Sequence, residues 1–498
     1  MKKIKIILTL SVALLLANGC KKDNLDVANV NDPDFEKVYA NGDNLISQAA
    51  SLYNTIFYNS HYEGGLQPML AVAADNSTCS YGNFGMRDMS WEPRDFAWTN
   101  TPAYTYNTQT NTYFNGQYAA INTASLIIKA INNGTNIAGG AGNARVKAYC
   151  RFIQGVGYAN LALTFDRAFI VDEASTVEGK LSSAVPYTAV ATAALKYLDE
   201  AIALSAANSF TIPQAWLGSD ADYSSAKLAQ LCNTYAASLL AYLPRNKAQN
   251  AAVNWAKVKT YADAGITTDF NVVLDDNIWY DYSAYYLGAG NSTWGRTDMY
   301  VVHMMDSAQP AHWDDSATFP APPASVNPQD KRLLSDFTYL SSNSFIAARG
   351  YYHFSNYRNK RYDFIYASTF TGIKPEIMKA ENDLLKAEAR LYLNDLAGAQ
   401  TIINAGTRVT RGQMTPAAAT TAALVDAIHH ERCIELIFTG ANIAFYEMRK
   451  LDLLQKGTPL QMPIPAKVME NLGESAPFYT FGTTAKADGI GTSNAGWR

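Results

Sequence analysis

"ENDLLKAEARLYLNDLAGAQTIINAGTRVTRG", residues 381–412, carries the clearest structural signal in the sequence. Apolar residues recur three and four positions apart around its start, at Ile377, Ala380, Leu384, Ala387 and Leu391. This spacing places them on one face of an α-helix. The run "INAGTRVTRG" closes this element, and a second helix is predicted over residues 417–438. Residues 376–498 are therefore predicted to form helices followed by loops.

The same periodicity recurs through the amino-terminal half of the chain. Five more helices are predicted there, over residues 113–131, 144–164, 186–206, 224–243 and 253–264. They are alanine-rich, amphipathic and joined by short turn-forming stretches, which is typical of stacked antiparallel helix pairs. No clean repeat of about 34 residues is visible. We therefore expect a mostly α-helical protein in which residues 41–264 form a helical scaffold.

Residues 265–375 have a different texture. Gly, Pro, Asn, Ser and aromatic residues dominate, and "FPAPPASVNP", residues 319–328, is typical of a rigid extended loop. Helical periodicity is lost, so we expect irregular loops. Long irregular stretches inside compact proteins are usually functional. Residues 265–375 are thus the expected location of a functional site.

Composition narrows the class of function. The chain has 498 residues, of which 48% are hydrophobic and 17% charged, a globular composition. Its formal net charge is −4, and the charges are spread evenly. A nucleic-acid partner would call for a basic face. We therefore expect no nucleic-acid partner.

The amino terminus, "MKKIKIILTLSVALLLANGC", is typical of a secretory signal. Its apolar run of roughly a dozen residues is too short for a bilayer, which needs about 20. The end resembles a bacterial lipobox, although Ala17 stands where leucine is more usual. We predict removal of residues 1–19, acylation of Cys20 as a membrane anchor, and a polar tether over residues 20–40. An ordinary signal peptide with a chance cysteine is the alternative.

The other four cysteines give no sign of a metal site or a disulfide framework. Cys79, Cys150, Cys232 and Cys433 are sparse and never form a CxxC pair. Three of them lie in apolar, helix-like settings. Buried free thiols are therefore favoured over disulfides.

The acids and histidines give little sign of catalysis. Glu431 and Glu435 lie four positions apart in "AIHHERCIELIF", and a retaining glycosidase needs two neighbouring carboxylates. Arg432 stands three positions before Glu435, so an intrahelical ion pair is the simpler interpretation. His429 and His430 are adjacent and lack the spacing of a zinc-binding HExxH helix. We therefore predict no catalytic residue, no metal site and no cofactor.

Several blocks, in order, resemble the SusD/RagB family of outer-membrane lipoproteins. They are "CKKDNLDV" at 20–27, "FNGQYAAINTASLIIKAI" at 114–131, "ARVKAYCRFIQGVGYANLALTFDRAFIV" at 144–171, the opening block at 381–412, "IHHERCIELIFTGANIAFYEMRKLDLL" at 428–454 and "MPIPAKVMEN" at 462–471. The carboxy-terminal blocks are the most specific. Two departures indicate a divergent member: "TGAN" at 439–442 replaces Glu-Gly-x-Arg, and "DRAFIV" at 166–171 lacks Gly-x-Pro.

The resemblance implies a single domain over residues 41–498, built on tetratricopeptide-like helix pairs with long irregular loops as the ligand face. It implies a non-catalytic lipoprotein at the outer surface of the outer membrane. Such a protein passes oligosaccharide, or alternatively oligopeptide, to a SusC-like TonB-dependent transporter. A surface hydrolase and a purely structural helical adaptor are the rival classes.

The candidate ligand contacts lie mainly in "NIWYDYSAYYLGAGNSTW", residues 277–294, which holds six large aromatic rings. Flat rings with a polar edge suit binding surfaces and stack on the C–H faces of sugars. Core filling is the default interpretation of any single ring, whereas the group of rings favours a binding surface. The predicted ligand-binding residues are Trp279, Tyr282, Tyr286 and Trp294, with Trp98 and Trp313 from other loops and Asp75 for hydroxyl groups.

Overall fold

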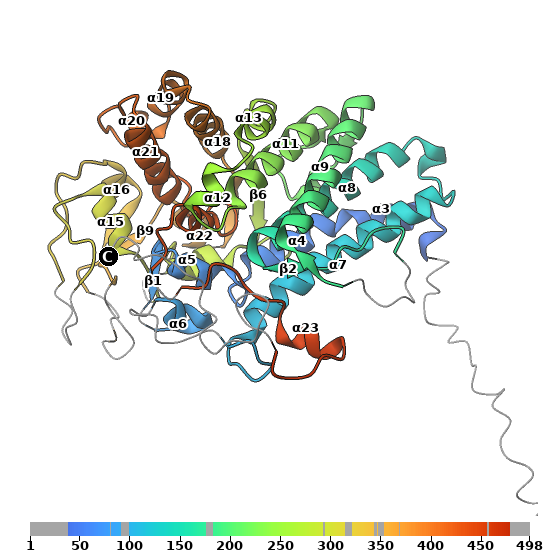
Figure 1. Cartoon of the computed structure of the whole chain (residues 1–498), viewed down its shortest axis with the longest axis horizontal. Helices are drawn as coiled ribbons and strands as arrows, with labels where there is room; N and C mark the ends of the chain where they lie inside the picture. Colours follow the sequence, from blue (N-terminus) through green and yellow to red (C-terminus); the bar gives the residue numbers. More distant parts are fainter. Residues whose placement is uncertain are drawn as a thin grey trace, which may run out of the picture.

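The computed structural model describes residues 38–79, 81–90, 99–175, 183–291, 294–313, 321–342, 346, 353–367, 369–455 and 458–478. Helices dominate this part of the chain, as the sequence predicts (Figure 1). No helix in these ranges combines the length and the apolar character needed to cross a lipid bilayer. The predicted signal peptide and Cys20 lie outside the described residues.

The five helices predicted in the amino-terminal half are confirmed. They are α7 (Asn107–Asn132), α8 (Asn143–Thr164), α9 (Tyr187–Ala207), α11 (Ser225–Tyr242) and α13 (Trp255–Asp263). Each packs against the next one in this order, so they form a continuous row of helices on the right and centre of Figure 1. The apolar stripes face one another across these contacts, which buries them away from water.

Two glycines let α8 lie close to both of its neighbours. A Cβ atom at Gly155 would come within 2.6 Å of Leu198 on α9, and one at Gly157 within 2.8 Å of Ile121 on α7. Both glycines lie inside the helix, where glycine costs about 1 kcal/mol relative to alanine. Close packing on both sides of α8 offsets that cost.

The carboxy-terminal helices continue the row. They are α18 (Lys379–Tyr392), α19 (Leu396–Ala405), α20 (Thr407–Thr410), α21 (Thr421–Ile434) and α22 (Ile443–Lys450). The α18 helix packs against α13 as well as α19 and α21. Asp395 begins α19 by accepting a hydrogen bond from the Gly398 N–H at 3.0 Å. These helices enclose a second, smaller hydrophobic core.

Residues 265–375 are more regular than the predicted loops. They contain strands β6 (Phe270–Asp275), β7 (Gly295–Thr297), β8 (Phe337–Tyr339), β9 (Tyr357–Asn359) and most of β10 (Thr371–Ile377), and helices α14 (Tyr282–Leu287), α15 (Met299–Met305), α16 (Arg332–Ser335) and α17 (Asp363–Tyr366). The sequence predicts a loop-rich region, and the structure adds these short elements within the loops. Most of these elements have only three to seven residues, too few to display a helical or strand period.

Short antiparallel ribbons tie this region together. Strand β6 pairs with β10, β8 pairs with β9, and β7 pairs with β1 (Ser77–Cys79). The remaining described α-helices and strands are α3 (Gly42–Ala50), α4 (Leu52–His61), α5 (Gln67–Ala73), α6 (Met86–Ser90), β2 (Arg167–Ala168), β3 (Val185–Pro186), β4 (Thr211–Ile212), α10 (Gln214–Leu217), β5 (Tyr223–Ser224), α12 (Lys247–Ala251) and α23 (Ala466–Asn471), and two 3-10 helices are η2 (Asn83–Gly85) and η3 (Ala138–Gly140). The segments that will form the site are therefore held by contacts distant in sequence.

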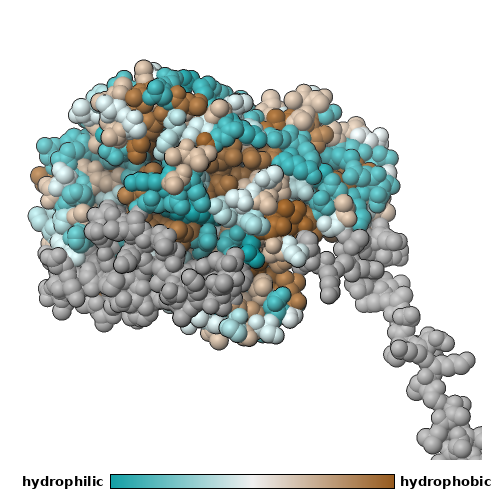
Figure 2. Space-filling model, in the orientation of Figure 1, coloured by the Kyte–Doolittle hydropathy of each residue, from teal (hydrophilic) through white to brown (hydrophobic). Residues whose placement is uncertain are grey.

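The surface and the thiols fit a folded helical protein. On the face drawn in Figure 2, hydrophilic residues spread over the outer helices and hydrophobic residues concentrate between them.

Cys79, Cys150, Cys232 and Cys433 are all buried and free. The prediction of free thiols is confirmed.

Candidate ligand-binding site

A turn orders the aromatic segment before α14 begins. The Asp275 carboxylate accepts hydrogen bonds from the backbone N–H groups of Asn277, Ile278 and Trp279 at 2.8–2.9 Å. Asp281 then caps α14 by accepting the Ala284 N–H at 2.9 Å. Two Asp side chains therefore set the start of the segment and of its helix.

Glycines fold the end of the segment back on itself. Gly288 and Gly290 have φ values of 142° and 72°, a region that other residues rarely adopt. At Gly295 a Cβ atom would lie 2.4 Å from the Leu287 carbonyl carbon. The reversal brings Trp294 onto Tyr286, with ring centroids 4.3 Å apart and planes 17° apart.

Seven partly exposed rings gather around this reversal. We call them the aromatic arc: Tyr58, Tyr62, Phe84, Tyr280, Tyr282, Tyr286 and Trp294. The centroid separations along it are 5.3 Å for Tyr62 and Tyr58, 5.5 Å for Tyr58 and Tyr280, 4.7 Å for Tyr280 and Tyr282, 6.5 Å for Tyr282 and Tyr286, and 5.8 Å for Trp294 and Phe84. Each ring thus supports the next while keeping part of its surface in water.

The arc packs against a second layer of aromatic side chains, of which Tyr366 is buried and Tyr285 and Phe370 are partly exposed. Tyr285 and Phe370 lie 5.0 Å apart, and Phe370 meets Tyr282 edge-on at 5.5 Å. Tyr366, which is buried, contacts Tyr285 at 5.8 Å. This second layer restricts the rotamers of the arc, so little side-chain entropy is left to lose on binding.

A buried charge cluster joins the two halves of the arc, namely the rings at the end of α4 and the rings of residues 280–294. The His61 Nδ1 atom lies 3.1 Å from the Asp281 carboxylate, and its Nε2 atom lies 2.9 Å from Glu376. The Lys374 ammonium lies 2.9 Å from Asp281. Tyr62 follows His61, whereas Tyr282 follows Asp281. The cluster therefore fixes the end of α4 against the start of α14.

Electrostatics explain why these buried groups remain charged. Burial alone would lower the pKa of His61, but the Glu376 and Asp281 carboxylates raise it to about 9. Burial likewise opposes ionisation of Asp281, yet Lys374 and His61 hold its pKa below the usual value. Two cations and two carboxylates then balance inside the protein, as buried charges require.

Acidic groups supply the hydrogen-bonding capacity of the arc. The Tyr282 hydroxyl donates to Asp276 at 2.7 Å, and this bond together with burial raises the pKa of Tyr282 to about 12. Glu63 follows Tyr62 and is partly buried, which raises the pKa of its carboxyl group. Carboxylates beside aromatic faces can accept hydrogen bonds from hydroxyl groups.

The structure brings together three of the seven predicted ligand contacts: Tyr282, Tyr286 and Trp294. Trp98 lies outside the described residues. Trp313 belongs to another loop, where its indole N–H donates to the Phe354 carbonyl oxygen at 2.7 Å.

Trp279 and Asp75 are corrected. Trp279 is only 5% exposed, because its ring packs against Phe57, 5.4 Å away, and against Gly218 in the core. It offers no free face for stacking. Asp75 is 1% exposed and accepts a hydrogen bond from Gln455 at 2.5 Å, so it does not reach surface hydroxyl groups.

Sequence reasoning missed four members of the arc: Tyr58, Tyr62, Phe84 and Tyr280. Tyr58 and Tyr62 are four positions apart at the end of α4, a spacing that puts two rings on one helix face. That spacing could have indicated from the sequence that the two rings lie side by side. Phe84 lies in a short turn with a φ of 54°. No pattern in the sequence predicts this backbone conformation.

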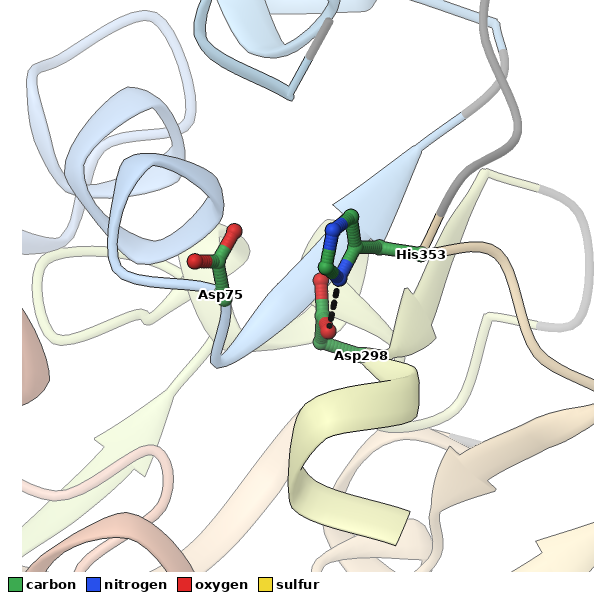
Figure 3. Close-up of side chains that lie close together, drawn as sticks. All are labelled: Asp75, Asp298 and His353. Atoms are coloured by element: carbon green, nitrogen blue, oxygen red, sulfur yellow. Dashed lines mark hydrogen bonds and ion pairs between the residues drawn. The ribbon is translucent and has the colours of Figure 1, made fainter. Parts of the chain in front are cut away.

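Asp75, Asp298 and His353 form a separate buried cluster (Figure 3). One potential ligand atom from each lies within 4.8 Å of the others, and two carboxylates with an imidazole could hold a divalent cation. Asp298 also accepts hydrogen bonds from His353 Nδ1 at 2.9 Å and from the Tyr300 N–H at 2.8 Å. Protein hydrogen bonds thus account for the positions of these side chains.

The predicted ion pair between Arg432 and Glu435 was wrong. Arg332 bridges Glu431 at 2.6 Å and Glu435 at 3.0 Å instead. Arg432 points to the other side of α21, where it pairs with Glu388 at 2.8 Å. Both glutamates are buried and paired with arginine, which is a structural arrangement.

An open groove of about 720 Å³ lies beside Glu431 and Glu435, against α18, α19 and α20. Its floor includes Met378, Leu384 and Ile403, and its lining contains no aromatic residue. Flat-face stacking is therefore unavailable there. The aromatic arc is the better candidate for ligand binding.

The comparisons with known proteins bear on the fold. The sequence matches no family model and no curated protein. Several solved structures are similar.

A SusD-like carbohydrate binding protein from Bacteroides fragilis has 16% identity and a TM-score of 0.59, and the match covers 83% of this chain and 86% of that one. A SusD-like protein from the same species has 14% identity and a TM-score of 0.57 over 83% and 86% of the two chains. A SusD superfamily protein from Bacteroides vulgatus has 16% identity and a TM-score of 0.56 over 84% and 89%. The expected fold is confirmed: the chain has the mostly helical architecture of the SusD-like proteins.

Proposed function

We propose that this protein captures oligosaccharide on the aromatic arc and does not transform it. The observation that carries the proposal is the stacked pair Tyr286 and Trp294, which continues into a row of partly exposed rings. Sugars present flat C–H faces that stack on such rings, while Glu63 and Asp276 accept hydrogen bonds from their hydroxyl groups. Similarity to a SusD-like carbohydrate binding protein from Bacteroides fragilis supports this ligand class.

Oligopeptide is the second candidate ligand, and the charges disfavour it. A peptide site often captures a carboxylate with arginine. Arg358 lies beside Gly288 next to the arc, but both of its terminal nitrogens already bind Asp363, at 2.7 and 2.8 Å. With that guanidinium engaged and acids on the arc itself, an uncharged sugar is the better fit.

We further propose that Cys20 carries a lipid anchor in the outer membrane and that the bound sugar passes to a SusC-like TonB-dependent transporter. The amino-terminal sequence and the SusD-like fold support this role. The test is extraction of the membranes with mild detergent and affinity capture of the full chain. A TonB-dependent barrel should co-purify in stoichiometric amount, and capture of the protein alone would contradict the partnership.

The ligand class is tested on purified protein with a panel of neutral oligosaccharides of differing linkage, followed by calorimetry on the one that binds. Tyr286→Ala and Trp294→Ala should each weaken its affinity about tenfold or more, because each removes a stacking face. Tyr187→Ala is the matched control, since Tyr187 is partly exposed at the start of α9, outside the arc. Unchanged affinity in both arc variants would contradict the proposal, and binding of oligopeptides alone would favour the second candidate.

A further inference from the structure

We propose that Glu63 makes the aromatic arc an anion-rejecting surface, so that its ligand is an uncharged oligosaccharide and not a uronic-acid or sulfated one. The assignment of ligand class rests on the proposed function. The charge of the surface is a property of the protein alone, and it can be measured without any ligand.

The position of Glu63 is set by the turn that ends α4. The Gly65 N–H donates to the Tyr62 carbonyl oxygen at 2.9 Å. A Cβ atom at Gly64 would lie 2.5 Å from the Tyr62 ring, so the ring folds back over the turn. Glu63 therefore emerges beside Tyr62 at the edge of the arc, half-buried.

The carboxylate of Glu63 acts on most of the arc. Burial raises the pKa values of the Tyr62, Tyr280 and Tyr286 phenols, the hydrogen bond to Asp276 raises that of Tyr282, and the negative charge of Glu63 adds a smaller contribution to all four shifts. These rings span both halves of the arc. One Glu63 oxygen is also buried without a hydrogen-bond partner among the described residues. That oxygen is shielded from solvent, but the negative charge of the carboxylate still repels a sugar carboxylate or sulfate at the arc.

The cations near the arc do not offset this charge. Lys374 is 2% exposed and pairs with Asp281 beneath the arc. Arg358 is engaged by Asp363. Asp276, by contrast, adds a second carboxylate at Tyr282. Glu63 and Asp276 thus place two carboxylates at the arc, beside Tyr62 and Tyr282.

The first test measures the field at the arc by collisional quenching of Trp294 fluorescence. The Trp294 signal is obtained as the difference between the wild type and Trp294→Phe. At low salt, caesium should quench this signal several-fold more efficiently than iodide. Glu63→Gln should bring the two quenching constants together, whereas Glu470→Gln, which removes one exposed charge from α23, should not. Equal quenching by the two ions in the wild type would overturn the proposal.

The second test uses one oligosaccharide in two charge states. A neutral glucan oligomer is compared with the same oligomer oxidised at C6 to carboxylates. The wild type should bind the oxidised chain about tenfold more weakly at low salt, and Glu63→Gln or molar salt should reduce that gap. Equal affinities for the two chains would overturn the assignment of ligand class.

The two tests also separate this inference from the proposed function. If no sugar of either charge binds, the proposed function fails and the ligand assignment fails with it, while the quenching result still decides whether the arc rejects anions. If the neutral sugar binds at the arc and Glu63→Gln changes neither test, this inference alone fails.

Discussion

At the scale of single residues, Arg432 is a buried side chain whose loss should cost much stability. It is 1% exposed as a residue, and its guanidinium pairs with Glu388 and Glu447, each at 2.8 Å. Although burial opposes ionisation of Glu447, Arg432 and Lys450 keep its pKa below the usual value. Without Arg432, two buried carboxylates would share the single ammonium of Lys450, which lies 2.5 Å from Glu388 and 3.2 Å from Glu447.

We therefore expect Arg432→Met to lower the free energy of unfolding by about 3–5 kcal/mol, measured by urea denaturation. Arg390→Met is the control, because Arg390 pairs with Asp395 at the surface and such pairs contribute about 0–1 kcal/mol. Equal losses of unfolding free energy in the two variants would contradict the expectation that the buried ion pairs of Arg432 stabilise the protein more than the surface pair of Arg390.

The same residues mark the limit of sequence reasoning about contacts. The helix spacing allowed Arg432 to pair with Glu435, but Arg332 occupies that carboxylate from a segment about a hundred positions away. Trp279 and Tyr282 are equally aromatic, yet one is buried and the other is not. In a segment with only one short helix, no period indicates which ring faces inward.

At the scale of elements, the junction of α4, α14 and β10 should respond to pH. The pKa of His61 is about 9 in the folded protein and about 6.5 in an unfolded chain. Its contribution to stability is thus fully present below about pH 6.5 and is lost as the pH rises through 9. In that window the free energy of unfolding should fall by at most about 1.4 kcal/mol per pH unit on account of His61.

The measurement is urea denaturation at pH 6, 7.5 and 9 for the wild type and His61→Gln. The difference in stability between the two proteins should shrink steadily toward pH 9. Two paired groups at the junction stay charged through this range, because the pKa of Asp281 is held below its usual value and that of Lys374 above it. A difference that does not depend on pH would contradict the assignment of the shift to His61.

Element length explains which parts of the fold the sequence predicts. The helices α8 and α9 have 22 and 21 residues, so several turns of apolar periodicity locate them within one or two residues. Strands β1 and β7 have three residues each, and their pairing joins positions more than two hundred apart. The local sequence pattern therefore predicts the helices of the scaffold. The arc cannot be predicted in this way, because it depends on contacts between residues far apart in the sequence.

At the scale of the whole molecule, burial of every described cysteine should appear in thiol chemistry. Cys79, Cys150, Cys232 and Cys433 are at most 2% exposed, and burial raises the pKa of the Cys150 and Cys232 thiols. Because the thiolate is the reactive form, a disulfide reagent such as DTNB should react with none of the four in the native protein. All four should react after unfolding in guanidinium chloride. Rapid reaction of the folded protein would contradict the burial.

The predicted lipid on Cys20 would hold the folded body at the membrane. If Cys20 is acylated, each buried methylene of its chains contributes about 0.8 kcal/mol to membrane binding, so two or more chains anchor the protein durably. Cys20→Ala should therefore move the protein from the detergent-rich phase to the aqueous phase in detergent phase separation. Its affinity for sugar in solution should stay unchanged, because the arc begins at Tyr58, well beyond the tether predicted over residues 20–40. Cys79→Ala is the control, since it removes a buried thiol and leaves the anchor in place. If Cys20→Ala remains in the detergent phase, the anchor is not at Cys20, and residues 1–19 do not act as a lipoprotein signal.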